Sequence, residues 1–530
     1  MATTNEQRLS HPPGGDITIE EEKESEICKF YKDKTVLITG ATGYLGKLVM
    51  EKLLRSCDVK KIFIIIREKK GKDPQKRFDE IFDEPCFEPI KRKNPTFKQK
   101  IQVLIGDAQF PNFGLSDEDI ETLKAECQVV FHYAATVRFD EKIRTATYIN
   151  IRAVRDLINI TKEMKHLKAF LHCSTAYSNC IHPVIEEKFY DPPIDPETLI
   201  NLVDTLDENT LQAITPGLLG KYPNTYTFTK CIAEAIVRKE ANNIPAALFR
   251  PSIVIATAKE PVGGWINNVY GATGVLLGAA LGVLRVMQLK KTNNADLVPA
   301  DFVVNSSIAA AWDVACDNCR NLDQKKQVRE EESKQEKDKT HVYNYVSTPE
   351  KPISWREFEN LGEKYGKQVP SEKCIWYYFF FTVESYWVYA LTKFLLHTVP
   401  ANVIDFLARC IGKEPMMVKG YQKINKFAEI LAFFGLNSFK FSNQNVQSMW
   451  KKLNEKDKEL FEFSMANLDW SIYFRTYVRG SRLYLLQDTL DTVPKGKVKY
   501  YKLMFAHYAL LTIFLAVFIK IIMIIFNFIF

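Results

Sequence analysis

Short apolar runs alternate with helix-like stretches over the first two thirds of the chain. The runs have the length of strands and lie at residues 35–39, 62–66, 101–105, 129–132, 169–173, 246–249 and 341–346. Amphipathic stretches, such as residues 47–54 and 153–164, lie between them. Alternation of this kind is typical of a parallel sheet covered by helices. We therefore predict an α/β fold, a Rossmann-type doubly wound parallel sheet, over residues 31–350.

The pattern changes near residue 376, where apolar and aromatic side chains crowd together. Residues 376–396 fit either a helix that dips into a membrane or a helix buried in the protein. Residues 401–490 carry patterns typical of helices. We therefore predict a mainly helical C-terminal domain over residues 351–490.

Two polar stretches lack the apolar residues that a packed core requires. Residues 1–30 are mostly polar and acidic, and they predict a disordered tail. Residues 324–340 are rich in charged and amide side chains and hold almost no apolar residue. This insert predicts a solvated loop or a frayed helix late in the first domain.

The last segment, residues 503–530, is a nearly continuous apolar run. At ~1.5 Å per residue in a helix it is long enough to cross a hydrocarbon layer of ~30 Å. Lys520 interrupts the run, and a hairpin or an interfacial segment is the competing interpretation. We predict a membrane-embedded anchor that contacts lipid, in the endoplasmic reticulum or peroxisome membrane. The catalytic body is expected in the cytosol because basic residues precede the run: Lys495, Lys497, Lys499 and Lys502.

Composition excludes several other classes of protein. The net charge of +7 is spread over 530 residues without a dense basic stripe, so nucleic-acid binding is not expected. The eleven cysteines are scattered and odd in number, and no apolar leader begins the chain. We therefore expect a reducing environment and no disulfides. The close pair Cys316 and Cys319 has no second pair beside it, so no metal site is predicted.

A glycine-rich loop follows the first predicted strand directly. Its three glycines, at residues 40, 43 and 46, stand between a strand and a helix, which is the context that dinucleotide binding requires. The first allows a tight turn, the second a close approach to the pyrophosphate, and the third close packing of helix on strand. The amides that open the helix attract phosphate. The predicted cofactor contacts of this loop are Gly40, Thr42, Gly43, Tyr44, Leu45 and Gly46.

Three further positions predict how the nucleotide is held. Arg67 follows the second strand, where an arginine suits a 2′-phosphate and an acidic residue would suit a free ribose hydroxyl. We therefore expect NADPH as the cofactor. Asp107 follows the third strand and would lie near the adenine amine. Ala134 follows the fourth, where a small residue leaves room for the cofactor.

A candidate catalytic pair is formed by Tyr226 and Lys230. Their spacing of four places both side chains on one helix face. A carbonyl that accepts a hydride becomes an alkoxide and needs a proton donor, for which we propose Tyr226. A free tyrosine has a pKa of ~10, and a nearby ammonium lowers it. Lys230 is expected to supply that ammonium and to hydrogen-bond the nicotinamide ribose.

Two hydroxyls end the fifth predicted strand, upstream of this pair. Ser174 and Thr175 are positioned to donate to the carbonyl oxygen of a substrate. Spacing does not separate the two hydroxyls. We take Ser174 as the first choice and Thr175 as the second. Direct attack of hydride on a thioester needs no acyl-enzyme, so we assign no nucleophilic role to Cys173.

These motifs together resemble the eukaryotic fatty acyl-CoA reductases, or male-sterility-type proteins, of the extended short-chain dehydrogenase superfamily. The resemblance covers residues 34–488. Beyond the sites already described, it is carried by residues 67–71, 132–140, 173–177, 250–252, 468–470 and 480–485.

The resemblance implies reduction of a long-chain fatty acyl-CoA to a primary alcohol with two NADPH, through a bound aldehyde. In that scheme Tyr226 donates the proton and Pro251, within residues 250–252, is added to the cofactor contacts. The C-terminal domain would help to enclose the acyl chain. One alternative is another extended short-chain reductase, acting on a hydroxysteroid or stopping at the aldehyde. Another is a non-catalytic lipid- or nucleotide-binding scaffold at a membrane.

Overall fold

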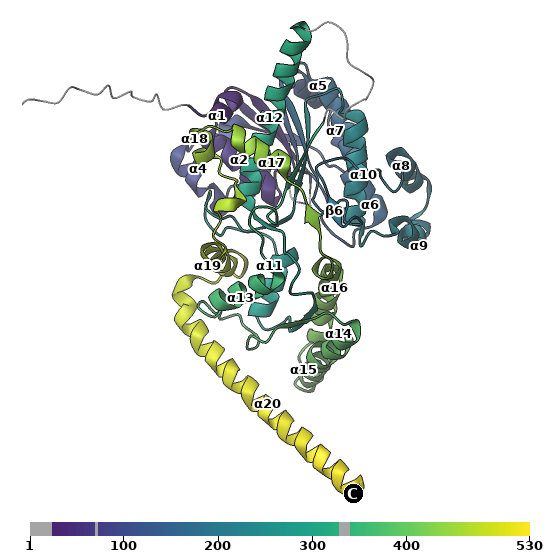
Figure 1. The fold of residues 1–530 in the computed structure, drawn as a ribbon, viewed down its shortest axis with the longest axis vertical. Helices are drawn as coiled ribbons and strands as arrows, with labels where there is room; N and C mark the ends of the chain where they lie inside the picture. The colour runs from purple at the N-terminus through teal and green to yellow at the C-terminus, as the bar shows by residue number, and fades with distance from the viewer. Residues whose placement is uncertain (1–23, 69–70, 72, 328–339, 530) are drawn as a thin grey trace, which may run out of the picture.

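A seven-stranded parallel sheet organises the first two thirds of the chain (Figure 1). The computed structural model describes residues 24–68, 71, 73–327 and 340–529. The strand order is β11-β7-β5-β4-β1-β2-β3, and every pairing is parallel. The predicted doubly wound sheet is therefore confirmed. Its strands are β1 (Thr35–Thr39), β2 (Lys61–Ile66), β3 (Ile101–Ile105), β4 (Val129–His132), β5 (Ala169–Cys173), β7 (Ala246–Pro251) and β11 (His341–Tyr345).

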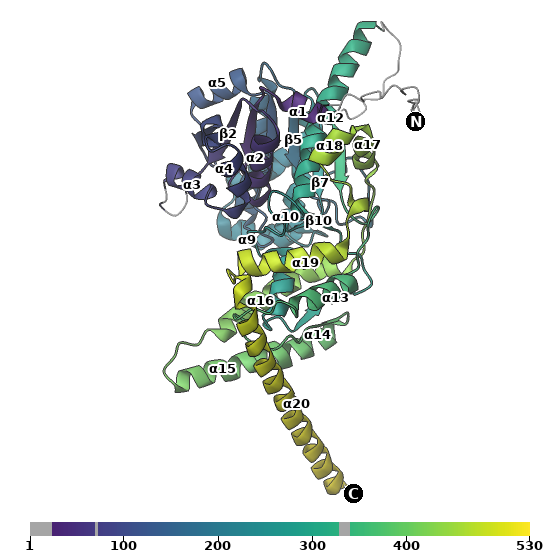
Figure 2. The ribbon, with the colours of Figure 1, turned by 90° about the vertical axis from the view of Figure 1, so that its left-hand side faces the viewer.

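Helices cover both faces of this sheet (Figures 1 and 2). One face carries α1 (Glu26–Tyr31), α2 (Tyr44–Ser56) and α12 (Ala300–Gln327). The other carries α5 (Asp117–Glu126), α7 (Ala153–Lys162) and α10 (Thr225–Glu240). Alternating side chains produce the two cores: Val36 and Ile38 pack under α2, and Leu37 packs under α7. Smaller helices of this domain are α3 (Pro74–Ile81), α4 (Glu88–Lys93), α6 (Ile143–Thr147), α8 (Pro196–Thr205) and α9 (Glu208–Leu219).

The predicted disordered tail is wrong for its last residues, which form α1. Ile27 and Tyr31 are fully buried there. The Ser25 hydroxyl donates to Asp457 Oδ1 at 2.6 Å, and the amide of Ile27 donates to the same oxygen at 3.1 Å. A partner more than 400 residues away orders this helix, and the local sequence does not reveal it. Residues 1–23 lie outside the described part of the chain.

The charged insert is also partly helical. Of the two alternatives predicted for the insert, a loop or a frayed helix, residues 324–327 follow the second, because they complete α12. Glutamine and lysine, which make up this stretch, are good helix formers, so the helix continues past its last apolar residue. Residues 328–339 lie outside the described residues.

The C-terminal third is mainly helical, as predicted, and it packs on segments of the first domain. In Figure 2, α13 (Trp355–Gly366) and α19 (Trp470–Gly480) lie side by side below the sheet. The first also packs on α11 (Gly271–Ala280). The remaining helices are α14 (Tyr386–Lys393), α15 (Val399–Cys410), α16 (Met417–Leu436), α17 (Gln444–Lys452) and α18 (Glu455–Leu460).

Short strand pairs tie the two parts together. β9 (Val286–Gln288) pairs with β12 (Phe381–Val383), and β6 (Val184–Ile185) pairs with β13 (Lys440–Phe441). A third pair, β8 (Ile253–Ile255) with β10 (Leu297–Pro299), continues beyond the end of β7. The first two pairs hold the C-terminal helices against the first domain.

Residues 376–396 do not form a buried helix. The stretch contains β12 and α14, and Trp387 on α14 is 80% exposed. Tyr386 and Leu391 are exposed as well. The buried alternative is therefore wrong for α14, which leaves the membrane-dipping interpretation.

The last helix, α20 (Val493–Ile529), projects from the body (Figures 1 and 2). Among the described residues it is the one helix long and apolar enough to cross a membrane. Its base is fixed to the body, because Lys499 Nζ donates to the Glu372 carbonyl at 2.6 Å and Trp376 Nε1 donates to His507 Nδ1 at 3.1 Å. The prediction of an apolar C-terminal helix is confirmed.

Candidate active site

The glycine loop joins β1 to α2 where the strand order reverses, between β1 and β4. Ligands of open α/β sheets bind at such a point. Gly40 has φ +71°, and a Cβ there would lie 2.7 Å from the amide nitrogen of Ala134. A Cβ at Gly46 would lie 2.3 Å from the carbonyl oxygen of Gly40. Helix α2 starts after Gly43 without a side-chain cap, so its first amides suit a phosphate.

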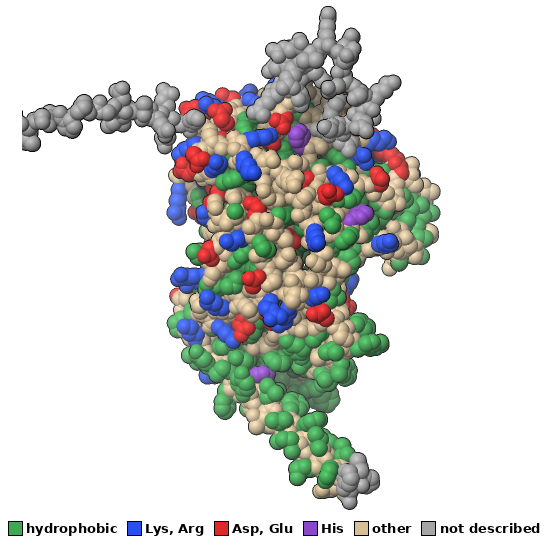
Figure 3. Space-filling model, in the orientation of Figure 1, with side chains coloured by type: hydrophobic (Ala, Val, Ile, Leu, Met, Phe, Trp, Pro, Cys, Tyr) green, Lys and Arg blue, Asp and Glu red, His purple; other side chains and the backbone are tan. Residues whose placement is uncertain are grey.

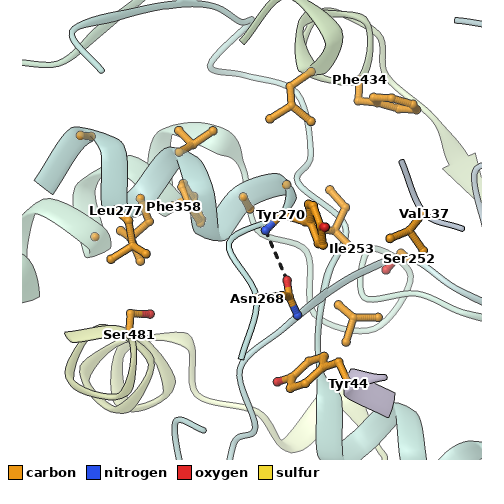
Figure 4. A pocket seen from close by; sticks show the side chains of 18 of the residues that line it. Tyr44, Val137, Ser252, Ile253, Asn268, Tyr270, Leu277, Phe358, Phe434 and Ser481 are labelled. Carbon is orange, nitrogen blue, oxygen red and sulfur yellow. Dashed lines mark hydrogen bonds between the residues drawn. The ribbon is translucent and has the colours of Figure 1, made fainter. Parts of the chain in front are cut away.

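A cavity of about 740 Å³ extends from this loop toward the C-terminal helices. Most predicted site residues line it: Gly40, Thr42, Gly43, Tyr44, Leu45, Gly46, Ser174, Thr175, Tyr226, Lys230 and Pro251. Figure 4 shows Tyr44 at one end of the view, and Leu277, Phe358 and Ser481 farther along. The loop and the candidate catalytic residues therefore face one shared space.

Three predicted cofactor contacts, Arg67, Asp107 and Ala134, do not line this cavity. Arg67 and Asp107 meet at the ends of β2 and β3, with Nη1 and Oδ2 3.4 Å apart. Ala134 lies at the end of β4 against Gly40, and its amide donates to Thr39 Oγ1 at 3.2 Å. Arg77 on α3 donates to the Arg67 carbonyl. The sequence analysis missed Arg77, because nothing in the spacing links α3 to the end of β2.

Tyr226 and Lys230 project from the first turns of α10. Asn224 caps this helix by accepting a hydrogen bond from the Thr227 amide at 2.9 Å. The Tyr226 ring stacks on Phe139 with centroids 5.8 Å apart. Lys230 is 2% exposed, and its Nζ donates to the Cys173 carbonyl at 2.7 Å. The pair is thus held rigidly and out of bulk water.

The pKa of the Tyr226 phenol is raised, not lowered as the sequence analysis expected. Burial is the main cause and the Cys173 thiol adds to it, while a hydrogen bond from Thr175 acts in the opposite direction. Burial also lowers the pKa of Lys230, against the attraction of Cys173 and Glu234. Desolvation sets the direction of both pKa shifts. The phenol therefore keeps its proton at neutral pH, as a proton donor must.

The structure separates the two candidate hydroxyls. Ser174 Oγ donates to Glu234 Oε1 at 2.5 Å, and both groups are buried. Arg250 holds the same carboxylate through Nε at 2.9 Å and Nη2 at 2.6 Å. The Ser174 hydroxyl thus donates its proton to a buried carboxylate, whereas the Thr175 hydroxyl makes only a longer contact, 3.5 Å, with the Pro251 carbonyl. The geometry favours Thr175, which reverses the order of preference given by the sequence.

Comparison with known proteins agrees with this architecture. Two family models match, an NAD-binding family over residues 38–307 and the Sterile family over residues 396–488, and both are described as male sterility protein. The chain is 42% identical to Fatty acyl-CoA reductase wat of Drosophila melanogaster, over 93% of this chain and 92% of the relative. It is 35% identical to Fatty acyl-CoA reductase 1 of Homo sapiens, over 92% and 91%. The chain belongs to the fatty acyl-CoA reductase family. The family likeness seen in the motifs is confirmed.

Solved structures share the fold of this reductase. One is the terminal R domain from the myxalamid PKS-NRPS biosynthetic pathway, with a TM-score of 0.53 and 15% identity over 87% of this chain and 93% of that one. Another is the reductase domain of a nonribosomal peptide synthetase from Mycobacterium tuberculosis, with a TM-score of 0.53 and 17% identity over 86% and 92%. At such identities the likeness concerns the fold alone. The family match makes the chain an oxidoreductase that binds a nicotinamide cofactor.

The buried Glu234–Arg250 pair is the main part of the reductase site that the sequence analysis missed. Glu234 lies four residues after Lys230, so one face of α10 carries Tyr226, Lys230 and Glu234 in succession. This repeated spacing of four residues could have pointed to Glu234 from the sequence alone. Its partner Arg250 is fully buried on β7, and only the pairing of β7 with β5 brings it to Ser174.

Replacing each hydroxyl in turn distinguishes the two candidates. Thr175→Val keeps the shape of the side chain and is expected to lower kcat on the order of 10²-fold, because one donor to the developing oxyanion is lost. Ser174→Ala is expected to retain most of the activity. Steady-state kinetics with cofactor binding measured alongside tests this. A larger loss of kcat in Ser174→Ala than in Thr175→Val would return the role to Ser174.

Proposed function

We propose that this reductase converts a long-chain fatty acyl-CoA into a primary fatty alcohol with two NADPH, through a bound aldehyde. The observation that carries the proposal is the single cavity that joins the glycine loop, the Tyr226–Thr175 pair and a long apolar extension. A nucleotide site alone would not need that extension. Ligand pockets of several hundred Å³ with apolar walls and few polar groups are typical of small-molecule sites.

The residues of the site account for both reductions. NADPH, when bound, supplies the hydride. The substrate oxygen gains negative charge in each reduction, and the Thr175 hydroxyl holds it while Tyr226 delivers a proton. The first reduction gives a thiohemiacetal, whose C–S bond breaks to release CoA as a thiol and leave the aldehyde. The second converts the aldehyde to the alcohol. Lys230 orients the nicotinamide ribose.

The apolar part of the cavity suits an acyl chain. Its lining includes residues of α11, α13 and α16, together with Tyr378 and with Tyr500 at the base of α20. Burial of a hydrocarbon chain against such walls is favourable in proportion to the apolar area removed from water. Apolar residues of this lining include Val275, Leu276, Leu277, Phe358, Leu431 and Phe434.

Product analysis tests the proposal directly. The full chain in detergent or nanodiscs is incubated with NADPH and a panel of acyl-CoAs, and the extract is resolved by gas chromatography. Long-chain primary alcohol is the expected product. Aldehyde as the end product would indicate an enzyme that stops after one reduction, and turnover of a hydroxysteroid alone would indicate a different short-chain reductase. Cofactor binding without any turnover would support the alternative of a non-catalytic scaffold.

We infer that NADPH is preferred over NADH. Arg67 and Arg77 lie together at the end of β2, where the ribose 2′-phosphate of a bound cofactor is expected. The guanidinium groups of Arg67 and Arg77 offer charged, forked donors that suit a dianionic phosphate better than a hydroxyl.

Reversing the charge at Arg67 tests this preference. Arg67→Glu is expected to raise the KM for NADPH about 10–100-fold, because a charge-assisted hydrogen bond contributes roughly 1.5–3 kcal/mol. The KM for NADH should change little. Arg92→Glu, on the exposed side of α4, is the matched control. An equal rise in the KM for both cofactors would show that Arg67 does not read the 2′-phosphate.

We also propose that α20 anchors the reductase in the endoplasmic reticulum or peroxisome membrane with the body in the cytosol. The basic residues at its base support this orientation. Protease treatment of intact, sealed organelles should degrade the body. Survival of the body would indicate the opposite orientation, with the body inside the organelle.

A further inference from the structure

The end of the molecule from which α20 projects carries a second uncovered apolar surface. In Figures 1 and 2, α14 and α15 lie at this same end, and Figure 3 shows hydrophobic side chains gathered over it. We call this surface the α14–α15 face. Its exposed members include Trp387, Leu391, Phe394, Phe406, Leu407 and Ile411. Trp387 is 80% exposed and Ile411 is 69% exposed. Monomeric soluble domains rarely leave so continuous an apolar surface in water.

The two charged side chains within residues 386–408 both have partners within the protein, one at the surface and one buried. Lys393 pairs with Glu429 at 2.7 Å. Asp405 is 5% exposed and accepts hydrogen bonds from the amides of Met417 and Val418, at 2.8 and 2.9 Å. An unpaired charge in a bilayer costs ~3 kcal/mol on insertion scales. Within residues 386–408, the α14–α15 face therefore carries no unpaired charge that would oppose its entry into lipid.

Basic residues border the α14–α15 face where α15 ends and α16 begins. Arg409, Lys413, Lys419 and Lys423 are all exposed, against one exposed carboxylate, Glu414. Each lysine or arginine near an anionic membrane surface contributes about 1 kcal/mol of attraction. An apolar face beside a basic border has the chemistry of an interfacial helix.

We propose that the α14–α15 face lies in the leaflet that α20 enters, as a second membrane contact. The proposal rests on α20 crossing the bilayer. Because Glu372 and Trp376 fix the base of α20 to the body, the face cannot be far from the lipid surface. Interfacial helices bury their apolar side ~5–10 Å into the headgroup and acyl boundary. The basic border then meets anionic headgroups.

This placement brings the substrate cavity to the membrane. The strand directly before α14, β12, pairs with β9, and both strands contribute residues to the cavity wall. Phe380 and Thr382 line the cavity from this segment, and Met287 lines it from β9. A lipid-embedded α14 therefore holds the apolar end of the cavity beside the bilayer. A hydrocarbon chain would have little water to cross between the two.

Fluorescent labels at matched positions test the contact in the full chain. Ile411 on the α14–α15 face and Ile472 on α19 are 69% and 68% exposed, and Ile513 lies on α20. Each is changed singly to cysteine and labelled with the fluorophore NBD. The protein is placed in nanodiscs of phosphatidylcholine and phosphatidylserine that contain a doxyl-labelled lipid. The background has serine in place of the cysteines that are not known to be buried, Cys28, Cys316, Cys319 and Cys410.

The expected result is strong quenching at positions 411 and 513, several-fold greater than at position 472. Quenching at 513 without quenching at 411 would overturn the second contact and leave the anchor in place. Absence of quenching at both would overturn the anchor as well. A blue-shifted but unquenched label at 411 would mean that a second copy of the chain, not lipid, covers the face, and this also overturns the proposal. Retained cofactor binding verifies folding in each variant.

Discussion

Tyr226→Phe is expected to lower the rate of acyl-CoA reduction about 10²–10⁴-fold, the usual contribution of a positioned general acid. The substitution removes one hydroxyl and keeps the ring that stacks on Phe139. Burial raises the pKa of this phenol, so the wild-type group carries its proton at neutral pH. Without it, the alkoxide formed by hydride transfer loses the phenol proposed to deliver its proton.

Binding and turnover must be measured separately to test Tyr226. NADPH binding, followed by protein fluorescence, should stay within a few-fold of wild type because the glycine loop is untouched. Tyr222→Phe is the matched control: its hydroxyl donates to Cys231 Sγ at 3.0 Å, away from the cavity. Activity in Tyr226→Phe close to that of the control would show that Tyr226 is not the proton donor.

The parts of the site that the sequence predicted are those fixed by local geometry. A glycine loop between a strand and a helix has one placement in a doubly wound sheet, so Gly40 and Gly46 could be assigned in advance. Tyr226 and Lys230 share a helix face because of their spacing. Both predictions needed only neighbours in the chain and the order of the strands.

The features of the site and fold that the sequence did not reveal depend on residues far apart in the chain. Ser174 and Thr175 are adjacent, and only the position of Glu234 and Arg250 determines which hydroxyl is free to meet a substrate. The raised pKa of Tyr226 follows mainly from burial, which the spacing between Tyr226 and Lys230 does not reveal. Helix α1 likewise depends on Asp457. Tertiary contacts of this kind leave no periodic signal.

Arg250→Met is expected to cost about 3–5 kcal/mol of unfolding free energy, because it leaves the Glu234 carboxylate buried without its cation. Arg250 is fully buried, and its two nitrogens lie 2.9 and 2.6 Å from the carboxylate oxygens. The Ser174 hydroxyl and the Asn179 amide remain, but neither carries a compensating charge. The loss should appear as a lower urea midpoint for the full chain in detergent.

A neighbouring arginine provides the control for Arg250. Arg238 lies on the same helix as Glu234 and pairs with Asp191 at 3.3 Å, but its side chain is 41% exposed. Arg238→Met should cost less than ~1 kcal/mol, the usual range for exposed pairs. Removing both partners, in Arg250→Met with Glu234→Leu, should recover part of the stability, since no buried charge is then left unpaired. If Arg250→Met shifts the midpoint no further than Arg238→Met, the buried pair does not stabilise the end of β7.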